Sequence, residues 1–260
     1  MKRAAVWLAI AAAALPLGAV KVDLNATPYL ERVFTDGERI EYSLSWLGVV
    51  GGSAVMTVDP RGEVIRIDSI AKSEGAIGRM YPVRDVIRSL ITRADFSTIR
   101  FEKTLNERGR HKKELTELDP RTGTGKRKGE EFTYTAPILD PLSSIYYIRT
   151  LDLTPGKRHT MRLLADGDEY EIEAIVLRRE NLKIDGMTFD TWLVEPKMTK
   201  GGIFRDESNR LLIWFTADAR RVPIRIRSEL EFGNITATLR RSRLGPFAAD
   251  AEGGESSPSP

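Results

Sequence analysis

The chain contains no cysteine and only two histidines among its 260 residues. Without cysteine, the fold cannot depend on disulfides or thiolate metal sites, and a thiol nucleophile and a lipid-modified cysteine anchor are both excluded. The histidines, His111 and His159, lie among basic residues, so we expect both on the surface. A zinc centre needs more ligands than these. We therefore expect no metal and no cofactor.

The sequence also lacks the common catalytic motifs and a strong excess of either charge. It has no Gly-x-Ser-x-Gly elbow, no phosphate-binding glycine-rich loop with lysine, and no His-Glu-x-x-His. The formal net charge is +3, and two of the positive charges, Lys2 and Arg3, lie in the N-terminal segment described below. Proteins that bind nucleic acid need a surplus of cations to displace phosphate counterions. We therefore expect neither an enzyme nor a nucleic-acid partner.

Long apolar runs are absent beyond the N-terminus. Residues 1–19 begin Met1-Lys2-Arg3, continue with an apolar stretch and end on Ala19, which is the pattern of a signal peptide. The apolar stretch is too short for a comfortable membrane span of roughly 20 residues. We expect cleavage after Ala19, export from the cytoplasm and no transmembrane span in the mature chain. An uncleaved membrane anchor is the alternative.

Alternation of apolar and polar residues predicts β-strands along most of the chain. Residues 39–46 alternate strictly, with Ile40 and Tyr42 on the apolar face, and residues 221–232 repeat the pattern. About a dozen such strands predict a single, mainly β domain over residues 37–245. The expected architecture is a curved antiparallel sheet that forms a barrel or half-barrel, because curvature removes exposed edges. A β-sandwich is the alternative.

One short helix and two flanking segments complete the predicted organisation. Asp140 followed by Pro141 predicts a helix start, with an N-cap residue before a proline at the first helical position. The helix is expected to end near Thr150. Residues 20–36 form an N-terminal lead-in of mixed character. Residues 246–260 are small, acidic and rich in serine and proline, which predicts a disordered tail.

Several ordered segments resemble a known family. They are residues 37–48 (GERIEYSLSWLG), 140–149 (DPLSSIYYIR), 194–197 (VEPK), 201–204 (GGIF), 212–216 (LIWFT) and 220–226 (RRVPIRI). They are similar to a bacterial exported family catalogued as domain of unknown function 3108. The resemblance implies export to the periplasm and a curved antiparallel sheet, broadly like the half-barrels of periplasmic carriers of lipoproteins and other lipids. It brings no catalytic residues with it.

A row of arginines is the first candidate binding feature. Arg221, Arg225 and Arg227 share one parity in the strand at 221–232, and successive same-face positions lie roughly 7 Å apart. Guanidinium groups at that spacing could grip phosphates or carboxylates of a lipid headgroup or an acidic glycan. Alternatively, they pair with acidic neighbours such as Glu195 or are simply solvated.

Aromatic residues are the second candidate. Trp46, Tyr146, Tyr147 and Trp214 could line a ligand cavity inside a curved sheet, or they could fill the core. The hypothesis that follows is a periplasmic, non-enzymatic binding protein for an amphiphilic envelope component, lipid or glycan, or for envelope machinery.

Two alternatives remain at this stage. The first is a scaffold or assembly factor that binds a protein partner. The second is an envelope glycan hydrolase that uses the carboxylates of residues 166–173. However, Glu169, Glu171 and Glu173 alternate with apolar residues, as on the solvated face of a strand.

Overall fold

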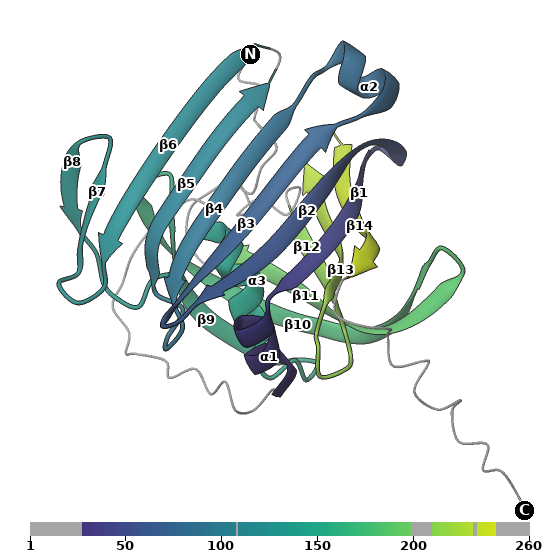
Figure 1. The fold of residues 1–260 in the computed structure, drawn as a ribbon. Helices are drawn as coiled ribbons and strands as arrows, with labels where there is room; N and C mark the ends of the chain where they lie inside the picture. The colour runs from purple at the N-terminus through teal and green to yellow at the C-terminus, as the bar shows by residue number, and fades with distance from the viewer. Residues whose placement is uncertain (1–27, 108, 199–209, 231–232, 243–260) are drawn as a thin grey trace, which may run out of the picture.

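The computed structural model describes residues 28–107, 109–198, 210–230 and 233–242. The predicted signal peptide and the predicted tail lie outside these residues. The described chain forms one large antiparallel sheet that curves around a helix (Figure 1). The predicted mainly β class and curved sheet are therefore confirmed, and the sandwich is wrong because there is one sheet rather than two.

The sheet has fourteen strands among the described residues. In chain order they are β1 (Glu38–Trp46), β2 (Val49–Arg61), β3 (Val64–Ser73), β4 (Arg84–Thr92), β5 (Thr98–Glu107), β6 (Arg110–Asp119), β7 (Thr124–Arg127), β8 (Glu130–Thr133), β9 (Arg158–Ala165), β10 (Asp168–Ile184), β11 (Met187–Met198), β12 (Arg210–Thr216), β13 (Pro223–Leu230) and β14 (Gly233–Ser242). Each strand pairs with its sequence neighbours within two meanders, β1–β8 and β9–β14. Pairing of β1 with β14 joins the meanders into one sheet.

Three helices accompany the sheet: α1 (Pro28–Asp36), α2 (Gly75–Met80) and α3 (Pro141–Ile148). The sequence predicted only α3. Its start is as expected, because the Asp140 side chain accepts hydrogen bonds from the amides of Leu142 and Ser143, and the Ser143 hydroxyl completes a capping box. All eight residues of α3 are buried. Helix α1 occupies the end of the predicted lead-in.

The core fills the inside of the curve. On β3, Ile65 and Ile67 are fully buried while their neighbours are partly exposed, so one face of the strand points inward. Helix α3 lies within the curve (Figure 1), and the ring of Phe96 packs edge-on against Phe34 of α1 at 5.2 Å and Tyr147 of α3 at 5.7 Å. Side chains from α1, α3 and the inward strand faces therefore pack into the main hydrophobic core, and Leu118, Tyr134, Ile138 and Leu164 form a second, smaller cluster.

A bridging segment, residues 134–140, connects the two meanders at one end of the strands. The amide of Thr98 in β5 donates to the carbonyl of Ile138 at 2.9 Å, and the amide of Leu139 donates to the carbonyl of Arg162 in β9 at 3.0 Å. The two halves of the curve therefore meet here through this segment rather than through direct strand pairing. The opposite end of β3–β6 carries α2 and the β5–β6 turn (Figure 1).

Candidate functional site

Of the three arginines in the predicted row, only Arg225 and Arg227 lie together on one face of a strand. Arg221 precedes β13, and its guanidinium donates to the backbone carbonyl of Arg149 at 2.8 Å, so it anchors a loop. Arg225 and Arg227 lie half-buried on β13 and face away from the core. Arg227 pairs with Glu229 at 3.2 Å, on its own strand.

The four predicted aromatic residues occupy separate settings. Tyr146 and Tyr147 are buried in α3 and contribute to the core. Trp214 is buried on β12, and its indole Nε1 donates to a carboxylate oxygen of Glu180 at 2.7 Å. Trp46 stands at the end of β1, where 52% of its surface is exposed. These side chains therefore do not line a common cavity.

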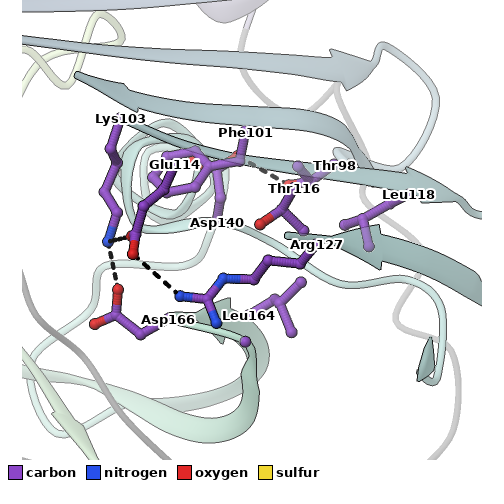
Figure 2. A pocket seen from close by; sticks show the side chains of 11 residues that line it. Thr98, Phe101, Lys103, Glu114, Thr116, Leu118, Arg127, Asp140, Leu164 and Asp166 are labelled. Carbon is purple, nitrogen blue, oxygen red and sulfur yellow. Dashed lines mark hydrogen bonds and ion pairs between the residues drawn. The ribbon is translucent and has the colours of Figure 1, made fainter. Parts of the chain in front are cut away.

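A small polar cavity lies where β5, β6 and β7 meet the β9–β10 turn. Figure 2 shows Lys103, Glu114, Arg127 and Asp166 pointing toward one another. The Lys103 ammonium lies 3.2 Å from Glu114 and also pairs with Asp166, while Arg127 donates to Glu114 at 3.4 Å. The cavity volume is about 10 Å³, which is room for one water molecule and for no substrate.

Two carboxylates at this cavity have pKa values shifted in opposite directions. Burial favours a raised pKa for Glu114, but a hydrogen bond from Lys112 and the charge of Lys103 outweigh it and lower the pKa to about 2. Burial raises the pKa of Asp140, against hydrogen bonds that include one from Thr98. Opposed shifts are typical of acid–base pairs. Here Asp140 caps α3 and Glu114 is enclosed by cations, so the arrangement is structural.

A larger concavity lies at the α2 end of the sheet. It is an open groove of about 410 Å³ between α2 and the β5–β6 turn, lined by residues between 73 and 84 and between 106 and 111. We call it the cationic groove, for the side chains that surround it. It is formed by segments that sit side by side because β4 pairs with β5 and the bridge between Val83 and Glu107 extends that pairing.

Glycines allow α2 to form one wall of the cationic groove. The amide of Glu74 donates to the carbonyl of Gly51 at 2.7 Å. A Cβ atom on Gly51 would come within 2.3 Å of the Ile77 side chain, and one on Gly78 within 3.0 Å of the Ser73 carbonyl oxygen. The helix therefore depends on these two glycines to approach the sheet this closely.

Hydrogen bonds fix the groove on its sheet side. The amide of Ser73 donates to the carbonyl of Val83 at 3.0 Å, and the amide of Val83 donates to the Ser73 hydroxyl at 2.8 Å. The side-chain amide of Asn106 donates to the carbonyl of Arg84 at 2.9 Å. The side-chain oxygen of Asn106 then faces Nδ1 of His111. Because an amide oxygen only accepts, His111 Nδ1 must be the donor in that contact. The backbone beneath the groove is thereby held in place before any ligand arrives.

The lining of the groove carries more positive than negative side chains. Most arginines of the described chain pair with a carboxylate, but Arg79, Arg84 and Arg110 form no ion pair with any described residue, and the same holds for Arg221 and Arg225. The one carboxylate that lines the groove, Glu74, is already engaged by the Lys72 ammonium at 2.9 Å. That hydrogen bond lowers the pKa of Glu74, so it stays ionised and occupied. Three arginines therefore lie at one groove without a carboxylate partner among the described residues.

Sequence reasoning missed this groove. The basic run at residues 110–113 is visible in the sequence and predicted only a solvated surface around His111. Helix α2, which forms one wall of the groove, was not among the predicted elements. Arg79 and Arg84 approach this run only through the register of β4 and β5, which no local pattern encodes.

The described residues contain no group of three or more histidine, aspartate or glutamate side chains placed to hold a metal ion. None of the helices in this part of the chain is both long and apolar enough to cross a membrane.

Comparison with known proteins gives a family. A family model described as "Protein of unknown function (DUF3108)" matches residues 41–240. The chain belongs to this family. The DUF3108 protein is similar in fold to a β-barrel-like protein of the DUF1849 domain from Brucella abortus, with a TM-score of 0.57 and 11% identity over 79% of this chain and 96% of that one.

A second solved structure is a DUF1089 family protein from Pseudomonas aeruginosa. Its TM-score is 0.41 at 13% identity, over 66% of the DUF3108 protein and 87% of that chain. No match was found among curated proteins. The similarity to the Brucella protein concerns the fold alone.

Proposed function

We propose that this DUF3108 protein is an exported, non-enzymatic binding protein of the periplasm. Its cationic groove would hold the anionic group of an amphiphilic envelope component, either a lipid phosphate or the carboxylates of an acidic glycan. The observation that supports this is the placement of Arg79, Arg84 and Arg110, without ion pairs among the described residues, around one groove of about 410 Å³. Guanidinium groups bind phosphate and carboxylate through paired, charge-assisted hydrogen bonds.

The size and position of the groove suit binding of one part of a ligand at the surface rather than enclosure of a whole ligand inside the curved sheet. Ligand sites typically measure roughly 300–1,000 Å³, so the groove can take a headgroup or a sugar unit. The interior of the curved sheet is packed with core side chains and helix α3. A ligand held in the groove would therefore keep its remaining bulk outside the protein.

Export and the lack of catalysis belong to the same proposal. The positive start, apolar stretch and Ala19 of residues 1–19 support secretion through a cleaved signal. The polar cavity with oppositely shifted carboxylates has room for one water molecule, so a glycan cannot enter between them. A binding role accounts for both features without a reaction.

Calorimetric titration of the mature chain tests the proposal. The probes are dihexanoyl phosphatidylglycerol below its micelle concentration and tetragalacturonic acid, which separate a lipid phosphate from a glycan carboxylate. At least one should bind, and its affinity should fall as salt is added. The variant R79Q/R84Q/R110Q should bind that probe roughly tenfold or more weakly, because three charge-assisted contacts are lost.

The matched control is R61Q/R121Q/R158Q, which removes three exposed arginines at other positions of the sheet. It should bind as the unaltered chain does. If neither probe binds, or if the two triple variants lose affinity equally, the cationic groove is not an anion site.

A further inference from the structure

Exposed apolar side chains gather beside the cationic groove. Eight large hydrophobic side chains are exposed among the described residues, and six of them lie on the β1–β2 turn or at the end of α2. These six, which we call the apolar tip, are Trp46, Leu47, Val49, Val50, Met80 and Tyr81. Met80 is 79% exposed and Val50 66%. An apolar cluster of this kind on a soluble surface marks an interaction site.

The two parts of the apolar tip lie at the same end of the sheet. Val49 and Val50 directly precede Gly51, whose carbonyl accepts the amide of Glu74 and whose backbone packs against Ile77 of α2. The β1–β2 turn and α2 lie near one another at this end (Figure 1). The tip borders the groove at Met80 and Tyr81, because they end α2, which forms one wall of the groove.

The β1–β2 turn holds Leu47 in a conformation that leucine disfavours. Leu47 and Gly48 form the two-residue turn between paired Trp46 and Val49, with φ values of 50° and 84°. Turns of this type favour asparagine or aspartate followed by glycine, because a leucine pays a steric cost at positive φ. Part of the Leu47 side chain lies against Gly233 at the start of β14, where an added Cβ atom would come within 2.6 Å of it. The side chain is nevertheless 58% exposed, which leaves most of it available for a further contact.

The positive charge beside the apolar tip indicates which partner fits both the tip and the cationic groove. An apolar tip flanked by Arg79 and the other groove arginines matches an anionic bilayer, whose phosphates lie above its acyl chains. Trp46 and Tyr81 are the residue types that favour the membrane interface. A second copy of the chain fits less well, since a symmetric contact at this end would bring two positive grooves together.

We propose that the apolar tip inserts into the surface of an anionic phospholipid membrane while the cationic groove engages its phosphates. This rests on the proposed function and names a bilayer lipid as the source of the anion. The protein would then work while docked on a membrane face, with α2 and the β1–β2 turn at the lipid and the bridging segment, residues 134–140, away from it.

Vesicle sedimentation with matched variants tests the insertion. The mature chain should partition onto vesicles of phosphatidylglycerol and phosphatidylcholine, and not onto phosphatidylcholine alone. The tip variant L47N/V50T/M80S should partition at least roughly tenfold less. The control I70T/M187S replaces the two exposed large hydrophobic residues outside the tip and should partition as the unaltered chain does. L47N alone places a residue that this turn type favours at position 47 and should still weaken partition.

The measurements distinguish a failure of the membrane-insertion proposal from a failure of the proposal that the groove binds an anion. Binding of soluble dihexanoyl phosphatidylglycerol should be the same in the tip variant as in the unaltered chain, because Leu47, Val50 and Met80 do not line the groove. If that binding is present but the tip variant and the control partition equally, the insertion is wrong and the groove stands. If neither soluble dihexanoyl phosphatidylglycerol nor tetragalacturonic acid binds to the unaltered chain, the groove is wrong. If only tetragalacturonic acid binds, the groove stands and the membrane proposal is wrong. Self-association that the tip variant abolishes would overturn the membrane as partner.

Tryptophan fluorescence independently reports whether the apolar tip reaches the acyl chains of the membrane. Trp46 is exposed, Trp214 is buried, and Trp192 lies half-buried on β11 against Arg179 and outside the tip, so acyl chains carrying bromine should quench Trp46 selectively. Quenching by brominated phosphatidylglycerol vesicles should be strong in the unaltered chain and largely lost in W46F. Quenching that is absent, or equal in W46F, would contradict the insertion.

Discussion

At the scale of single residues, Glu114 shows how much environment changes a side chain. Its carboxylate is 5% exposed and lies within 3.2 Å of Lys103 and 2.9 Å of Lys112. The sequence around Glu114 could not show that cations from three strands and a carboxylate from the β9–β10 turn converge there. Likewise, the parity of Arg225 and Arg227 was visible in the sequence, but the pairing of Arg227 with Glu229 was not.

The pKa of Glu114 predicts a specific acid sensitivity. The pKa falls from its ordinary value of 4.5 to about 2 in the folded chain. Because the folded pKa is depressed, the stability that the charge contributes is present above about 4.5 and is lost as the pH falls toward 2. The difference in free energy of unfolding between the unaltered chain and E114Q, measured in urea, should therefore shrink over that interval.

Two comparisons make that measurement decisive. E117Q removes an exposed carboxylate from the same strand and should show little change in this difference with pH. If the difference for E114Q stays constant from neutral pH to pH 2, the cations do not stabilise the charge of Glu114.

At the scale of elements, α3 was predictable and the other two helices were not. Asp140 and Pro141 are a strong local start signal, and the structure confirms it. Helix α2 is six residues long and contains two glycines, so its stability comes from packing on Gly51 rather than from periodicity. Strands β7 and β8 are separate short strands, because Lys128-Gly129 turns with positive φ at both residues.

Helix α3 is tied to β1 by a buried ion pair. Arg149, at the end of α3, donates to both carboxylate oxygens of Glu38 at 2.7 and 3.0 Å and to the carbonyl of Arg220 at 2.8 Å. Both charged side chains are fully buried. R149M should lower the free energy of unfolding by about 3–5 kcal/mol, because Glu38 would be left buried and unpaired.

The double variant E38Q/R149M tests whether Glu38 and Arg149 stabilise the fold through their interaction with each other. It should be less destabilised than the sum of the two single variants, as measured by urea unfolding, since no charge is then left alone. R61M, which breaks the exposed pair with Asp59, should cost less than about 1 kcal/mol. Simple additivity of E38Q and R149M would show that the two side chains do not interact.

At the scale of the whole molecule, the fold class could be predicted from the alternation of apolar and polar residues, but the cationic groove could not. Alternation predicts strands and an inward face, and the single curved sheet is what these strands form. The cationic groove needs α2, β4 and the β5–β6 turn to meet at one end, which depends on strand register. Register is set by cross-strand packing, so residues far apart in sequence become neighbours without any shared motif.

The most direct test of this account is to map the binding surface of the mature chain by amide NMR during titration with dihexanoyl phosphatidylglycerol. The shift changes should be confined to residues between 73 and 84 and between 106 and 111. They should vanish in R79Q/R84Q/R110Q. Changes centred instead on Arg225 and Arg227, on the face of β13 away from the core, would contradict the account and favour the arginine row.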